Sequence, residues 1–168
     1  MQTTRFTHLS GLALAVLFTL LVGSVGADNS LITRHKLEGT WDVTLRFSCE
    51  HPQCPCPGGT PNIPIPGLHL YLEHGRYVDA SGGNLFRSSA LGSWERRGDH
   101  QFEVRYKFFL FNADGSRSGS EEVTNHIHLT GPDTFEAEAI FHLFDANGNE
   151  TSPEEEGCRL NGTGTRFE

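Results

Sequence analysis

The stretch Gly39-Thr40-Trp41-Asp42-Val43-Thr44-Leu45-Arg46-Phe47 decides the fold of this chain, together with the segment Cys158–Phe167 near its other end. In the first stretch, Trp41 and every second residue after it are apolar. This alternation is typical of a β-strand that buries one face. The second segment carries Arg166 close to its end. We therefore predict that these two strands lie side by side, with Arg166 stacked on Trp41.

The same alternation recurs through the rest of the chain, in short segments separated by turn residues such as His74-Gly75 and Gly131-Pro132-Asp133. The segment 50–67 contains six of the eight prolines, so we expect a long loop there rather than a central strand. The pattern predicts eight strands. They cover residues 40–48, 68–73, 76–80, 88–97, 101–111, 119–130, 134–145 and 158–167.

Short connections between consecutive strands indicate an up-and-down meander. Such a meander must cover its first and last edges, and closing into a barrel covers both. The predicted fold is therefore all-β, a single eight-stranded antiparallel up-and-down β-barrel. A β-sandwich is the alternative, but its crossovers need longer connections than this chain offers.

Barrel closure fixes a register that can be counted along the sequence. With Trp41 opposite Arg166, an antiparallel pair places Phe47 opposite Leu160. Two residues further on, the same register places Cys49 opposite Cys158. The first and last strands would thus be joined at both ends.

The four cysteines are Cys49, Cys54, Cys56 and Cys158. An even number in an exported chain favours two disulfides. Directly opposed residues satisfy the Cα separation of about 7 Å that a disulfide needs, so we predict a Cys49–Cys158 bond, with Cys54 and Cys56 left to pair or to remain reducible. A metal site is the alternative, because His51 lies among three of the thiols.

The strands predicted over 119–130 and 134–145 form a hairpin around Gly131-Pro132-Asp133. Its register places Val123, Asn125, Ile127 and Leu129 on the inner face. The outer face then pairs histidines with glutamates: His128 with Glu136, His126 with Glu138, and His142 with Glu122. Three histidines on one face suggest a metal site, but we favour an exposed ladder of opposite charges.

Residues 1–27 have the pattern of a secretory signal peptide, with a weakly basic start, an apolar core and small residues before Asp28. The apolar run from Gly11 to Val22 is twelve residues long, short of the ~20 that span a bilayer. We predict a secreted or periplasmic protein whose mature part, 28–168, is a single domain without membrane insertion.

The formal net charge of −8 argues against nucleic acid as a partner, because binding to phosphates requires clustered Lys and Arg. The chain carries no Gly-x-Ser-x-Gly sequence and no Gly-rich phosphate loop. We therefore predict no catalytic residues, no cofactor and no metal. The sequence leaves the oligomeric state open.

The inner surface of the barrel is the predicted ligand site. It is mainly apolar, with Tyr106 and Asn125 as its few polar members, and these could orient a ligand by hydrogen bonds. Two alternatives use the same interior: large side chains fill it, or a cyclase or isomerase acts in it with Tyr106 and Asn125. The predicted ligand-binding residues are Val104, Tyr106, Phe108, Asn125, Ile127, Ala139 and Phe141.

Gly39-Thr40-Trp41, the long loop over 50–67, the eight-strand meander and Arg166 together resemble the calycins, the lipocalin-like superfamily of small secreted barrels. The resemblance implies a barrel that encloses a cavity. It also implies that the first long loop covers the cavity, which would place Cys54, Cys56 and Pro64 near the mouth of the barrel.

Overall fold

The computed structural model describes residues 36–48, 52, 54, 63–81, 86–153 and 157–167. The predicted signal peptide lies outside these ranges, as do Cys49, His51 and Cys56. Within the described ranges, no helix has the length and apolar character needed to cross a membrane.

The described chain forms eight β-strands and a single 3-10 turn, η2 (Glu73–Gly75), between the second and third strands. The fifth and seventh strands begin and end where the sequence predicts, and the other boundaries agree within three residues. The strands are β1 (Gly39–Phe47), β2 (Ile65–Leu72), β3 (Arg76–Ser81), β4 (Ala90–Arg96), β5 (Gln101–Phe111), β6 (Arg117–Leu129), β7 (Thr134–Asp145) and β8 (Cys158–Arg166).

The largest boundary difference is at β2, which begins at Ile65 inside the predicted loop and contains Pro66. Pro66 pairs with Thr44 of β1, and among the described residues the pairing of β2 with β3 begins at Gly67. Proline has no N–H to donate, so it is tolerated where one side of the strand has no partner.

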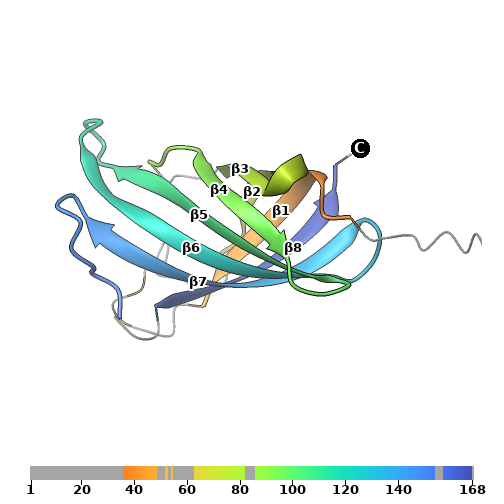
Figure 1. The fold of residues 1–168 in the computed structure, drawn as a ribbon. Coiled ribbons are helices and arrows are strands. Elements are labelled where there is room, and N and C mark those ends of the chain that lie inside the picture. The colour runs from red at the N-terminus through yellow and green to blue at the C-terminus, as the bar shows by residue number, and fades with distance from the viewer. Residues whose placement is uncertain are drawn as a thin grey trace, which may run out of the picture. The chain divides into compact units, whose positions relative to one another are not determined.

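The eight strands close into an antiparallel barrel in sequence order, with β1 hydrogen-bonded to both β2 and β8. Figure 1 shows β1, in orange, beside β8, in dark blue. Trp41 pairs with Arg166 and Phe47 with Leu160. The predicted barrel and its closing register are confirmed, and the sandwich alternative is wrong.

Trp41 and Arg166 close one end of the barrel, which we call the floor. The Arg166 guanidinium carbon lies 4.4 Å from the centroid of the Trp41 ring. The fully buried indole donates its Nε1 hydrogen to the Leu37 carbonyl at 2.8 Å, and Arg166 donates to the carbonyls of Lys36 and Glu38 at 2.7 Å each. These bonds hold the segment before β1 across the floor.

Two glycines allow this close packing. Gly39 has a φ of +128°, a backbone conformation that side chains disfavour, and a Cβ there would lie 2.6 Å from Arg166 Nη1. A side chain at Gly164 would overlap the ring of Phe135, which packs against Trp41 at a centroid distance of 4.9 Å.

The β6–β7 register is also as predicted. Leu129, Ile127, Asn125 and Val123 lie opposite Phe135, Ala137, Ala139 and Phe141, and all eight are buried. The three His–Glu pairs also stand opposite each other in the backbone register.

One of these outer pairs makes different side-chain contacts. His142 Nδ1 lies 2.6 Å from Glu150 Oε1, while Glu122 accepts a hydrogen bond from Lys107 at 2.7 Å. Within the described residues, no three His, Cys, Asp or Glu side chains are grouped to hold a metal ion.

The predicted Cys49–Cys158 disulfide is wrong, because Cys158 is bonded to Cys54, with a Cα–Cα distance of 5.4 Å. The predicted pair required the β1–β8 register to continue to position 49. The strand instead ends at Phe47, and Cys54 lies beside Gly157 and Cys158. The bond also removes Cys54 from the alternative metal site and from a pair with Cys56. It fixes Cys54 at the end of the barrel opposite the floor, where the calycin resemblance placed it.

Candidate functional site

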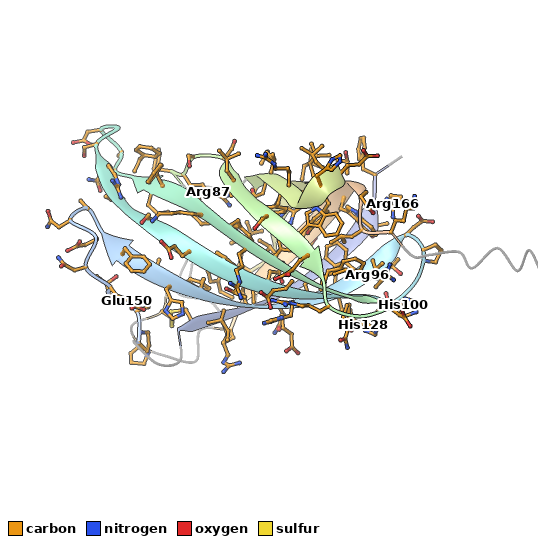
Figure 2. The ribbon with its side chains drawn as sticks, in the orientation of Figure 1. Arg87, Arg96, His100, His128, Glu150 and Arg166 are labelled. Atoms are coloured by element: carbon orange, nitrogen blue, oxygen red, sulfur yellow. A yellow bond between two sulfur atoms is a disulfide. The ribbon has the colours of Figure 1, made fainter. Side chains whose placement is uncertain are left out.

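A cavity of about 310 Å³ lies at the end of the barrel opposite the floor, where β1 ends and β8 begins. Figure 2 shows Arg87, which lines this cavity, and Arg166, which closes the floor, in different halves of the barrel. We call this space the mouth cavity. Its lining residues are Leu45, Phe47, Ile65, Ser81, Arg87, Tyr106, Phe108, Leu110, Glu121, Leu143 and Leu160.

Seven of the lining residues are apolar, and they come from β1, β2, β5, β7 and β8. They reach the same space because alternate residues of each strand point inward and these strands end or begin at the same rim. Leu110 and Leu143 remain partly exposed at that rim. The greater part of the wall can therefore contact only the apolar body of a ligand.

The polar part of the wall centres on Arg87, in the segment between β3 and β4. Its Nη2 lies 3.0 Å from both carboxylate oxygens of Asp79, and its Nε donates to the Ser88 carbonyl at 3.1 Å. The guanidinium carbon lies 3.7 Å from the ring centroid of Phe108. An ion pair and an aromatic face thus hold the arginine at the cavity.

His69 lies next to this ion pair, opposite Asp79 in the β2–β3 pairing, and is fully buried. Its Nδ1 lies 3.0 Å from the Tyr77 hydroxyl and 3.4 Å from that of Tyr71, and its Nε2 lies 3.4 Å from Ser81 Oγ. Burial lowers the pKa of His69 to about 4, against a smaller opposing effect of Asp79. The ring is therefore neutral at pH 7, accepting at one nitrogen and donating at the other.

Three tyrosines continue the network from His69 to the cavity. The ring centroids of Tyr71 and Tyr77 are 5.2 Å apart, and those of Tyr77 and Tyr106 are 4.9 Å apart. Burial raises the pKa of all three hydroxyls. Each therefore keeps its proton and serves as a hydrogen-bond donor.

Glu121 of β6 completes the polar wall. It stands opposite Phe108 in the β5–β6 pairing and is only 7% exposed. Burial raises the pKa of its carboxyl to about 8, in spite of the nearby Arg87. Within the described part of the chain, no hydrogen bond satisfies this carboxyl. At neutral pH it is an uncharged acid that lines the cavity.

The structure separates the predicted ligand-binding residues into two groups. Tyr106 and Phe108 line the mouth cavity. The others are buried on the inner face but do not line it: Val104, Asn125, Ile127, Ala139 and Phe141. Asn125 is 2% exposed, and its side-chain oxygen has no hydrogen-bond partner in the described chain.

The expectation that Tyr106 and Asn125 are the few polar residues of the interior is wrong. The interior also buries His69, Asp79 and Glu121, together with the Arg87 side chain. Part of this network was readable from the sequence, because a hairpin centred on His74-Gly75 places His69 opposite Asp79 and Tyr71 opposite Tyr77. Arg87 lies outside the regular strands, and strand periodicity says nothing of where its side chain goes.

Comparison of this chain with models of known protein families and with curated proteins finds no match. Membership of the calycin superfamily stays a prediction, because a barrel fold alone does not identify a superfamily or a function.

Proposed function

We propose that this protein binds a small, mainly apolar molecule in the mouth cavity. One observation carries the proposal: the cavity has apolar residues from five strands over most of its wall and a few polar groups on the rest. Small-molecule sites are typically of this kind, with volumes of roughly 300–1,000 Å³. At about 310 Å³, this cavity suits a ligand at the small end of that range.

The packing of the barrel supports the same proposal. Bulky side chains such as Trp41, Phe135 and Leu129 fill the interior on the floor side. At the other end, the lining side chains leave a space of about 310 Å³ between them and lack the dispersion contacts that close packing provides there. A bound apolar molecule would restore them.

Binding fits these residues better than the cyclase or isomerase that was the alternative. Tyr106 lines the cavity, but its raised pKa makes it a weak proton donor at neutral pH. Asn125, its expected partner, does not line the cavity.

A secreted or periplasmic location is part of the proposal. The Cys54–Cys158 disulfide supports it, because such bonds persist in oxidising compartments.

A dye-binding measurement tests the proposed function. We expect the polarity-sensitive dye ANS to bind the wild-type protein saturably. Leu110→Trp places an indole at the cavity rim and should weaken this binding about tenfold or more. Leu91→Trp is the matched control, because Leu91 is 67% exposed on the outer face. Absence of binding, or equal weakening in the two variants, would contradict the proposal.

A further inference from the structure

The polar wall of the mouth cavity is rich in hydrogen-bond donors. Arg87 uses Nε and Nη2 in contacts with Ser88 and Asp79, while its Nη1 makes no hydrogen bond within the described part of the chain. The Tyr106 hydroxyl and the Glu121 carboxyl likewise have no hydrogen-bond partner there. All three side chains line the cavity. Little of each side chain is exposed: 6% of Arg87, 6% of Tyr106 and 7% of Glu121.

The charged acceptor beside this wall, the Asp79 carboxylate, is already occupied. Both oxygens of Asp79 face Arg87 Nη2, and one of them also accepts the Ser81 backbone N–H at 2.6 Å. His69 contacts Ser81 Oγ through Nε2 and the Tyr77 hydroxyl through Nδ1, so both of its ring nitrogens have partners. Arg87 can only donate, whereas the Tyr106 hydroxyl and the protonated Glu121 carboxyl can donate as well as accept. All three can therefore donate to one ligand acceptor, and the charge of Arg87 favours such a group.

The donors also lie close to one another. Phe108 has the Arg87 guanidinium over its ring, and Glu121 is its neighbour across the β5–β6 pair. Tyr106 precedes Phe108 by one inward-facing position on β5 and stacks on its ring at a centroid distance of 6.4 Å. A single ligand group placed beside Phe108 would therefore have donors on several sides.

From this arrangement we infer that the ligand enters with a carbonyl oxygen first, and that Arg87, Tyr106 and Glu121 donate hydrogen bonds to it. The inference rests on the proposed function and names its ligand class: small apolar ketones, aldehydes, esters or carboxylic acids. The apolar body of such a molecule would lie against Leu110, Leu143 and the other apolar lining residues. An alkylammonium ion is disfavoured, since Arg87 repels it and, among the described lining residues, no free carboxylate receives it at neutral pH.

A comparison of two probes of equal chain length tests the inference. Methyl octanoate offers a carbonyl oxygen, and octylamine offers an ammonium group. Displacement of ANS should rank methyl octanoate above octylamine by about tenfold or more at pH 7. Glu121→Leu removes one donor and should weaken methyl octanoate about three- to tenfold, the equivalent of one hydrogen bond. Glu121→Gln restores a donor and should recover most of that loss.

The pH dependence of binding gives an independent readout. The charged and titratable groups around Glu121 are Arg87, Asp79 and Tyr106. Glu121 loses its proton near pH 8 and becomes a carboxylate that repels a carbonyl oxygen. Affinity for methyl octanoate should therefore fall as the pH rises through about 8 in the wild type. In Glu121→Gln it should stay constant.

The outcomes separate the inference from the proposed function. Octylamine binding as tightly as methyl octanoate would overturn the inference but leave apolar binding in place. A failure of both probes and of ANS to bind would overturn the proposed function itself. If Glu121→Leu does not fold, Tyr106→Phe and the pH series decide the question. Unchanged methyl octanoate affinity in Tyr106→Phe, together with a flat pH profile for the wild type, would overturn the inference.

Discussion

Arg87 and Asp79 form an ion pair inside the barrel, in which the Arg87 Nη2 lies 3.0 Å from each carboxylate oxygen of Asp79. The two side chains are 6% and 0% exposed. The charges cancel, and the neighbouring His69 remains neutral because burial lowers its pKa to about 4. Because Asp79 neutralises Arg87, the interior can hold the hydrogen-bond donors of this arginine without a net charge.

Breaking this ion pair should destabilise the protein strongly. Asp79→Asn leaves the guanidinium of Arg87 buried without a counter-charge, and we expect the free energy of unfolding to fall by about 3–5 kcal/mol. Urea denaturation measures this change. Asp42→Asn is the matched control, because Asp42 is exposed on β1 and should change stability by less than about 0.5 kcal/mol. Equal stability of the two variants would show that the pair is not buried as described.

Glu121 should make the barrel less stable as the pH rises. Its folded pKa of about 8 lies above the ordinary value of 4.5, so between these values the folded state binds more protons than the unfolded state. The free energy of unfolding then falls with increasing pH, by at most about 1.4 kcal/mol per pH unit, and levels off above pH 8.

His69 gives the opposite slope, but only between its folded pKa of about 4 and its ordinary value of 6.5. Urea denaturation between pH 6.5 and 8 therefore isolates the effect of Glu121. Glu121→Gln should remove the decline over this interval. The same pH slope in the variant and the wild type would rule out Glu121 as its source.

The floor depends on arginine and not merely on a positive charge. Arg166 stacks on Trp41 and donates to several backbone carbonyls at once, a geometry that a lysine ammonium cannot reproduce. We expect Arg166→Lys to reduce the free energy of unfolding by about 2 kcal/mol. Arg159→Lys, on the exposed face of the same strand, is the control and should be close to neutral. Thermal unfolding of both variants checks this, and a neutral Arg166→Lys would contradict it.

The Cys54–Cys158 disulfide should contribute to stability because it closes a long loop. The two residues are 104 positions apart, and restricting such a loop in the unfolded chain stabilises the fold by about 2–4 kcal/mol. The double variant Cys54→Ser, Cys158→Ala should lose about this much in chemical denaturation. A double variant as stable as the wild type would mean that the bond only fastens a local segment.

The regular part of this fold was predictable because residue alternation sets both the strands and their faces. Counting outward from Trp41 and Arg166, and from the turn at Gly131-Pro132-Asp133, gave pairings that the structure confirms. Each count depends only on the two-residue period of a strand. Such counts end where the strands end.

The features that the sequence did not predict are of two kinds. Some residues lie outside the alternating strands, and others are polar residues at inward strand positions. Cys54 is in a segment without strand periodicity, so its approach to Cys158 could not be counted. His69 and Asp79 occupy inward positions that apolar residues usually fill, and they are stable there only because Arg87 and the tyrosines satisfy them. Arg87 reaches them from beyond the end of β3, and this contact depends on the tertiary structure.

The most direct test of the proposed binding site is a methyl NMR titration of the wild-type protein with methyl octanoate. We expect chemical-shift changes in the methyl groups that line the mouth cavity, those of Leu45, Ile65, Leu110, Leu143 and Leu160. Methyl groups of Ile127 and Leu129 on the floor side, and of Leu91 on the outer face, should not shift. Absence of any shift at saturating ligand, or shifts confined to Leu91 and other outer residues, would contradict binding in the mouth cavity.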